Sequence, residues 1–211
     1  MGLQNYLKVK KSLEVYSPQE DTWFLTDTLV KYFDFLDRLN FKKLHVCEIG
    51  LGSGYISALL GKKYPNINFI GVDIYFGAVE LSYKNMIPWI KLNQFSLICS
   101  NLLNPFNPET FQPDVIYFNP PYVRTSTDEY KNETTPIIKA WAGGPSGTAV
   151  IYKFLENLKE FNFKIGFFLS SKFNDNEGFE KNFRKKFRFE IINEKKVEDE
   201  KLLCYQVILR K

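Results

Sequence analysis

The sequence has few of the residues that build metal centres or disulfide frameworks. Its 211 residues include 1 His and 3 Cys, and no two cysteines are spaced as Cys-x-x-Cys. A zinc site needs about four nitrogen, sulfur or oxygen ligands, and a disulfide framework needs paired cysteines. We therefore expect no metal bound by the protein's own side chains. We also expect a reducing, cytoplasmic location, and a nuclear location stays open.

Long apolar runs are missing as well. No stretch of about 18 apolar residues occurs, so we expect no membrane-spanning helix. Residues 1–11 contain lysines but no apolar stretch behind them, so we expect no secretory signal. Aromatic residues make up 17% of the chain, which is too many for a disordered protein. We expect one domain over residues 1–211, with residues 1–14 as an N-terminal arm.

The excess of positive charge is small. The chain has 28 Lys and Arg against 24 Asp and Glu, a net charge of +4. Most of the basic residues are lysines scattered along the chain, which indicates a chain-wide compositional bias and not a basic surface for nucleic acid. We therefore do not expect a nucleic-acid partner.

Short apolar segments alternate with helical patterns. Ser17 as an N-cap, followed by Pro18 and Glu20, predicts a helix that continues to about Leu39. Further helices are expected over residues 55–63, 77–85, 148–161 and 177–186, and strands over 44–49, 67–72, 95–99, 115–118, 165–169, 187–197 and 202–210. Repeated strand–helix units predict an α/β fold, in which a mostly parallel sheet has helices on both faces and the C-terminal hairpin adds an antiparallel edge.

Polar and glycine residues follow the first two expected strands. In such sheets, ligands bind at the carboxyl ends of the strands. The first strand ends near Glu48, and Gly50, Gly52 and Gly54 let the following backbone turn sharply and approach a ligand closely. The second ends in Asp73, whose carboxylate can accept hydrogen bonds from both hydroxyls of a ribose. These residues indicate a nucleoside site.

The third strand is followed by Asn101 and Leu102. The Asn side chain can accept a hydrogen bond from an exocyclic amine, and the Leu side chain offers an apolar face to a purine. A plain turn residue beside a core residue is an equally good interpretation of this pair.

The most specific pattern is Asn119-Pro120-Pro121-Tyr122, directly after the fourth strand. The Asn119 amide oxygen and the Pro120 carbonyl can each accept one N–H of a planar NH₂ group, which would steer the nitrogen lone pair out of conjugation. The two prolines fix the backbone, and Tyr122 can stack on a planar substrate group. The pattern predicts a site that makes such a nitrogen nucleophilic, with Asn119, Pro120 and Tyr122 as catalytic residues and Pro121 as a further substrate contact.

Together, these motifs resemble class I S-adenosylmethionine-dependent amino-methyltransferases. Two further segments narrow the resemblance. Residues 15–22 (VYSPQEDT) and 140–147 (AWAGGPSG) resemble the Tyr-x-Pro-x-Glu-Asp-Thr and Ala-Trp-Ala-Gly-Gly-x-x-Gly segments of the eukaryotic and archaeal HemK-like release-factor glutamine methyltransferases. The resemblance runs from about Val15 to the C-terminus.

This resemblance implies a seven-stranded Rossmann-like sheet of order 3-2-1-4-5-7-6. It implies methylation of the side-chain amide nitrogen of the glutamine in the Gly-Gly-Gln motif of the class 1 translation termination factor, by a heterodimer with a small zinc-binding activator. In that strand order, residues 95–99 form an apolar open edge that the activator could cover. Packing of these residues on the chain's own helices is an equally good interpretation. The implied S-adenosylmethionine site is Thr22, Glu48, Gly50, Gly52, Asp73, Asn101, Leu102 and Asn119, and the implied substrate site is Asn119, Pro120, Pro121 and Tyr122.

Two departures and three alternatives accompany the resemblance. Asn101 stands where the family usually has Asp, and Tyr75-Phe76 replaces the usual Asn-Pro after Asp73. Asn-Pro-Pro-Tyr also serves enzymes that methylate flipped adenines, so a DNA or RNA adenine amino-methyltransferase stays open. A protein-lysine methyltransferase and a binding protein without catalysis are the other two alternatives.

Overall fold

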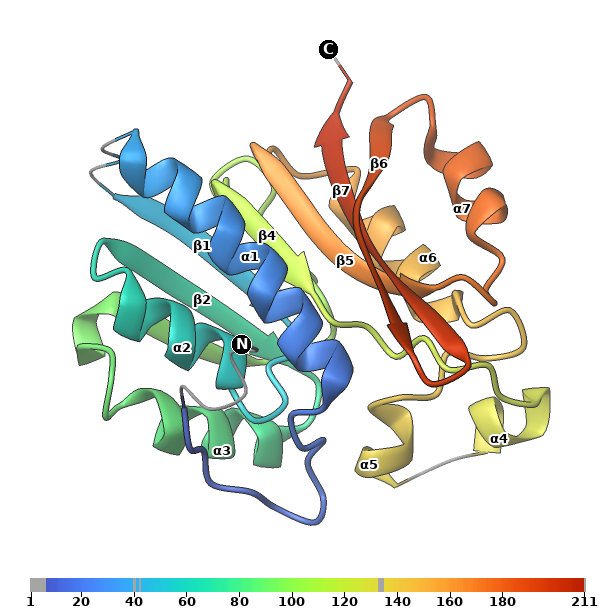
Figure 1. The fold of residues 1–211 in the computed structure, drawn as a ribbon, viewed down its shortest axis with the longest axis horizontal. Coiled ribbons are helices and arrows are strands. Elements are labelled where there is room, and N and C mark those ends of the chain that lie inside the picture. The colour runs from blue at the N-terminus through green and yellow to red at the C-terminus, as the bar shows by residue number, and fades with distance from the viewer. Residues whose placement is uncertain (1–6, 40, 42, 133–134, 211) are drawn as a thin grey trace.

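The computed structural model describes residues 7–39, 41, 43–132 and 135–210. In this part of the chain, seven strands form one sheet with the order β3-β2-β1-β4-β5-β7-β6 (Figure 1). The predicted fold class and strand order are therefore confirmed. The strands are β1 (Leu44–Ile49), β2 (Ile67–Asp73), β3 (Phe95–Cys99), β4 (Val115–Phe118), β5 (Ile165–Ser171), β6 (Phe187–Val197) and β7 (Glu200–Leu209).

The strand directions agree with the expected βα units. β1 pairs in parallel with β2 and β4, β2 pairs with β3, and β4 pairs with β5. β7 runs antiparallel to both β5 and β6, and a register shift between Ile191 and Asn193 interrupts the pairing of β6. The carboxyl ends of β1 to β5 consequently lie along one edge of the sheet, where ligands bind in folds of this kind.

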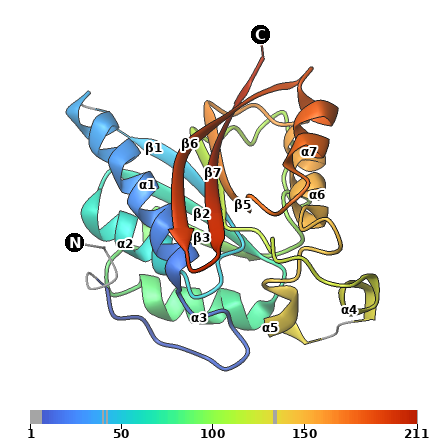
Figure 2. The ribbon, with the colours of Figure 1, turned by 45° about the vertical axis from the view of Figure 1, so that its right-hand side comes forward.

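Helices cover both faces of the sheet (Figure 2). One face carries α1 (Glu20–Arg38), α2 (Tyr55–Lys63) and α3 (Phe76–Met86), and the other carries α6 (Ala149–Leu158) and α7 (Asn176–Phe183). Two short helices, α4 (Thr127–Asn132) and α5 (Pro136–Lys139), lie between β4 and α6, where the sequence predicted neither helix nor strand. At 6 and 4 residues, they are too short to produce a helical apolar period.

Two apolar clusters fill the two sides of the sheet. Phe33 of α1 belongs to the first cluster, and Phe154 of α6 belongs to the second. Tyr117 and Phe118 of β4 join different clusters because successive strand residues point to opposite faces. Asn119 follows directly, so packing on both faces of β4 fixes the place where its side chain emerges.

The start of α1 differs from the prediction. Its N-cap is Gln19 and not Ser17, and Pro18 lies outside the helix. The Gln19 N–H donates to the Thr22 hydroxyl at 3.4 Å, so the first turn of the helix closes two residues later than it would with Ser17 as the N-cap. This start buries Asp21 and Thr22 in the first turn of the helix.

Among the described residues, no helix combines the length and the apolar character that a bilayer span requires.

Candidate active site

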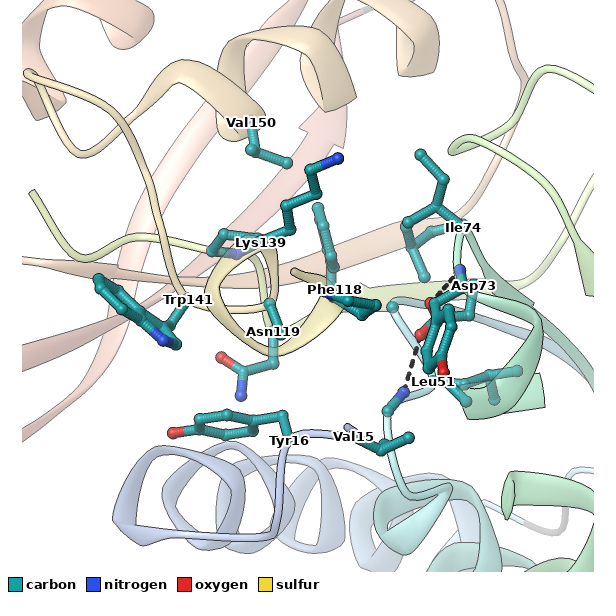
Figure 3. Close-up of a pocket in the computed structure, with 18 of the residues that line it drawn as sticks. Val15, Tyr16, Leu51, Asp73, Ile74, Phe118, Asn119, Lys139, Trp141 and Val150 are labelled. Atoms are coloured by element: carbon teal, nitrogen blue, oxygen red, sulfur yellow. Dashed lines mark hydrogen bonds between the residues drawn. The ribbon is translucent and has the colours of Figure 1, made fainter. Parts of the chain in front are cut away.

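A cavity of about 710 Å³ lies at the carboxyl ends of the central strands (Figure 3). Its walls come from the arm before α1, the loops after β1, β2, β3 and β4, and the segment that contains α5. Of the eleven site residues predicted from the sequence, ten line this one cavity: Thr22, Glu48, Gly50, Gly52, Asp73, Asn101, Leu102, Asn119, Pro121 and Tyr122. Pro120 is buried behind the wall, so its predicted role depends on its carbonyl oxygen. The structure brings these residues together, and their individual roles stay predictions.

The loop after β1 is held tightly against its neighbours. The Gly50 N–H donates to the Val72 carbonyl at 2.8 Å, which continues the pairing of β1 and β2 into the loop. Gly54 has a φ of 72°, and a Cβ atom there would lie 2.9 Å from the Cα of Ser82 in α3. Only glycine combines this conformation with this close approach. The loop backbone therefore forms a fixed floor of the cavity.

Asp73 at the end of β2 is oriented by backbone donors. One carboxylate oxygen accepts the Gly52 N–H at 2.9 Å, and the other accepts the Tyr75 N–H at 2.9 Å (Figure 3). Each carboxylate oxygen can accept two hydrogen bonds, so each of them keeps one free acceptor position. Burial raises the pKa of this carboxyl, while the backbone N–H groups oppose the shift. The pair of free positions matches two adjacent hydroxyl groups.

Glu48 at the end of β1 is buried, 2% exposed, in the wall of the cavity. Its carboxyl accepts hydrogen bonds from the Ser57 hydroxyl and, at 3.1 Å, from the Tyr117 hydroxyl. Burial raises the pKa of Glu48 to about 8, although both hydroxyls favour the charged form. At neutral pH, the acid is therefore mostly protonated until a cationic group lies beside it.

The loop after β3 contains a residue in an unusual conformation. Leu102 has a φ of 51°, in the left-handed region that costs a non-glycine residue about 1–2 kcal/mol. The Ser100 N–H donates to the Asp73 carbonyl at 2.8 Å and ties this loop to the end of β2. As a result, Leu102 is half-buried at the cavity wall, and Asn101 beside it is exposed.

Asn119 carries the most informative atom of the site. Its Nδ2 donates to the Asp21 carboxylate at 2.9 Å, while its Oδ1 is buried and has no hydrogen-bond partner among the residues that the structure describes. A buried acceptor without a donor costs about 1–3 kcal/mol. An N–H group that entered the cavity and reached Oδ1 would remove this cost.

The segment around residues 140–147 braces the Asn-Pro-Pro-Tyr turn. The Val123 N–H donates to the Trp141 carbonyl at 3.0 Å, and the Gly143 N–H donates to the Val123 carbonyl at 2.7 Å. In the sequence, the AWAGG pattern indicated a family resemblance but no structural role. In the structure, it forms a short parallel bridge directly beside Tyr122.

Two residues that contact this turn were missed by the sequence reasoning. Asp21 is the acceptor of the Asn119 amide. Asn174, after β5, donates from Nδ2 to the Tyr122 carbonyl at 2.9 Å and to the Gly147 carbonyl at 3.2 Å. Asp21 lies inside segment 15–22, which carries the family resemblance, so the sequence did point to this region. Asn174 belongs to no motif.

Comparisons with known proteins agree with this architecture. Residues 10–142 match the methyltransferase small domain family. The eRF1 methyltransferase catalytic subunit mtq2 of Schizosaccharomyces pombe is 33% identical over 172 residues, which cover 77% of this chain and 74% of that protein.

Solved structures share the fold at lower identity. A chain of the E. cuniculi Mtq2-Trm112 complex, described as responsible for methylation of the eRF1 translation termination factor, superposes with a TM-score of 0.67 at 22% identity. The match covers 94% of this chain and 100% of that one. The N-terminal domain of human METTL16 in complex with SAH gives a TM-score of 0.63 at 14% identity, covering 98% and 77%.

The family match covers more than half of the residues, and the fission-yeast relative spans most of both chains. The chain thus belongs to the methyltransferase small domain family, and it is a relative of the eRF1 methyltransferases.

Proposed function

We propose that the chain transfers a methyl group from S-adenosylmethionine to the side-chain amide nitrogen of the glutamine in the Gly-Gly-Gln motif of a class 1 release factor. The observation that carries this proposal is the buried, unpartnered Oδ1 of Asn119 in a cavity wall. A neutral primary amide can donate an N–H to it. The relation to the fission-yeast eRF1 methyltransferase supports the substrate class.

The residues of the cavity fit S-adenosylmethionine. The two free acceptor positions of Asp73 would take the ribose hydroxyls, and Glu48 would lie beside the ammonium group. Leu102 would pack on the purine, and Asn101 would accept from its amine. When bound, the cofactor supplies an electrophilic methyl group.

The chain's own contribution is the placement of the amide. Asn119 Oδ1 and the Pro120 carbonyl accept its two N–H groups and turn the nitrogen lone pair toward the methyl group. Positioning of this kind can supply roughly 7–11 kcal/mol of the barrier. The same two acceptors stabilise the positive charge that develops on nitrogen, and the proton then leaves to water. Burial and the nearby Asp21 charge raise the pKa of Tyr122, so its ring remains a neutral surface for stacking.

We also propose that a small activator subunit covers the β3 edge. In the described part of the chain, β3 is the terminal strand of the sheet, so one row of its backbone groups has no neighbouring strand there. Exposed apolar side chains lie just before it, with Ile87 43%, Trp89 39% and Leu92 66% exposed. An open apolar edge is a template for a partner strand. The S. pombe relative is named a catalytic subunit, and the E. cuniculi structure is a complex, which supports a second chain.

The test uses labelled S-adenosylmethionine and a release factor with its Gly-Gly-Gln loop, with and without the zinc-binding activator. A loop with Gln→Ala serves as the control substrate. We expect label on the wild-type loop only, and mainly when the activator is present. Label on the Gln→Ala protein that is recovered as methyl-lysine would indicate lysine methylation, and label on added duplex DNA or RNA would indicate a nucleic-acid methyltransferase. Either result would overturn the proposed substrate.

The edge is tested separately by Leu92→Glu, which places a charge in the apolar patch. Phe35→Glu is the matched control, because Phe35 is 56% exposed on α1. We expect Leu92→Glu to weaken co-purification with the activator and Phe35→Glu to leave it unchanged. Equal co-purification of both variants would place the activator elsewhere.

A further inference from the structure

The cavity contains an acid, Asp21, to which the proposed function gives no part in holding the substrate amide. Asp21 lies in the first turn of α1 and is 6% exposed. It comes from the same segment as Tyr16 and Thr22, while the Asn119 that it contacts is 98 residues away. The contact joins the start of α1 to the end of β4.

Asp21 gathers donors on both of its oxygens. Oδ1 accepts the Thr22 N–H at 2.6 Å and the Thr22 hydroxyl at 3.3 Å, and Oδ2 accepts Asn119 Nδ2 at 2.9 Å. The Tyr16 hydroxyl lies 3.2 Å from both oxygens. All of these donors are neutral, and together they fix the rotation of the carboxylate.

This arrangement decides how the Asn119 amide is turned. A carboxylate can only accept hydrogen bonds, so the Asn119 NH₂ group must face Asp21 and its Oδ1 must face away. In Figure 3, the amide nitrogen of Asn119 points toward the side of Tyr16, and the oxygen points away from it. The oxygen is the atom left without a partner. Donation of an N–H to a charged acceptor also polarises the amide and makes its oxygen a stronger acceptor.

We propose that Asp21, held by Tyr16 and Thr22, is a positioning residue that fixes the Asn119 amide with Oδ1 presented to the substrate nitrogen. This inference rests on the proposed amide methylation. It gives the Tyr-x-Pro-x-Glu-Asp-Thr segment a role in orienting the acceptor, in addition to the cofactor contact expected of Thr22.

The substitution Asp21→Asn tests this role with almost no change of shape. Because the Thr22 N–H still requires an acceptor at the Oδ1 position, the new NH₂ group takes the Oδ2 position and faces the Asn119 NH₂. Two donors cannot share this contact, so the Asn119 amide rotates and presents its own NH₂ to the substrate. We expect kcat to fall by about 100-fold, while the cofactor Kd changes less than about twofold. Asp37→Asn, at an exposed position of the same helix, is the matched control and should keep full turnover.

A double-variant cycle separates positioning from a general structural effect. In an Asn119→Ala background, the group that Asp21 orients is absent, so adding Asp21→Asn should cost less than about twofold in kcat. If the kcat losses of Asp21→Asn and Asn119→Ala multiply in the double variant, the inference is overturned. Wild-type turnover of Asp21→Asn would overturn it as well. Tyr16→Phe removes one donor to Asp21 and should lower kcat by about tenfold.

A readout that needs no substrate separates this inference from the proposed function. The side-chain NH₂ resonances of Asn119, assigned by their loss in Asn119→Ala, should shift in Asp21→Asn and stay in place in Asp37→Asn. If wild-type protein does not methylate the Gly-Gly-Gln loop but this shift occurs, the proposed function fails and the orientation by Asp21 stands. If the resonances do not move in a folded Asp21→Asn protein, the inference is wrong whatever the substrate.

Discussion

Gly143 lies against the backbone of Tyr122, and a Cβ atom at position 143 would come within 2.8 Å of the Tyr122 carbonyl carbon. Real Cβ atoms do not approach backbone this closely, so any larger residue must push the Asn-Pro-Pro-Tyr turn away. The glycine of the 140–147 segment thereby sets the position of the residues that are proposed to hold the substrate.

We expect Gly143→Ala to lower turnover by about 100-fold, because a displacement near 1 Å at the turn is enough for such a loss. The free energy of unfolding should fall by about 1–3 kcal/mol through overpacking. Steady-state kinetics and thermal denaturation measure the two effects. Gly178→Ala, in α7 outside the cavity, is the control, because its added Cβ crowds the Asp175 and Tyr152 side chains and not the backbone of the Asn-Pro-Pro-Tyr turn. Normal turnover of Gly143→Ala would mean that the turn tolerates the shift.

Glu48 should couple cofactor binding to proton release. Its pKa of about 8 means that the free protein holds a proton there at pH 7, while a neighbouring ammonium group favours the carboxylate. Binding of S-adenosylhomocysteine at pH 7 should therefore release close to one proton, and affinity should rise as the pH rises toward 8. Calorimetry in buffers of different ionisation enthalpy measures the release. Glu48→Gln should abolish it, and release that persists in this variant would assign the proton to another group.

The raised pKa of Glu48 also makes the stability of the fold depend on pH. Glu48 ionises near 4.5 as a free side chain and near 8 in the folded protein, so the folded state retains the proton over this interval. The contribution of Glu48 to stability is present below pH 4.5 and is lost as the pH rises toward 8. In the cofactor-free protein, Glu48→Gln should remove this part of the pH dependence.

We expect a substitution at Asn101 to strengthen cofactor binding. A carboxylate accepts hydrogen bonds more strongly than a neutral amide, and Asn101 lies exposed in the cavity wall beside Leu102. If Asn101 accepts from the adenine amine, Asn101→Asp should tighten cofactor binding by about 3–10-fold. Titration calorimetry with the cofactor and with an analogue that lacks the adenine amine gives the comparison. Equal tightening for both ligands would indicate a general charge effect and no contact with the amine.

The sequence predicted the parts of this site that follow from local patterns. Strand ends are visible because buried strands are apolar and stop at polar or glycine residues, so Glu48, Asp73 and Asn119 could be placed at one sheet edge. The cap of α1 was misplaced at Ser17, because the Thr22 hydroxyl forms a better first turn with Gln19. The partners that orient the site were missed for another reason. Asp21 reaches Asn119 across 98 residues, and Asn174 reaches Tyr122 across 52, and no local pattern encodes such contacts.

Asn174 provides a test of these long-range contacts. Its Nδ2 donates to two carbonyls, those of Tyr122 and Gly147, from the loop after β5. Asn174→Asp replaces the donor with an oxygen that faces both carbonyls, so the turn loses its brace and an acceptor is left unpaired. We expect the free energy of unfolding to fall by about 1–3 kcal/mol. Turnover should fall by about 100-fold, while the cofactor Kd should change little, because Asn174 contacts the substrate side of the cavity wall. Asn182→Asp is the matched control, since the Asn182 side chain in α7 donates to the Tyr152 hydroxyl, away from the Asn-Pro-Pro-Tyr turn. A loss of cofactor affinity as large as the loss of turnover would show that the loop after β5 supports the whole cavity and not the Asn-Pro-Pro-Tyr turn alone.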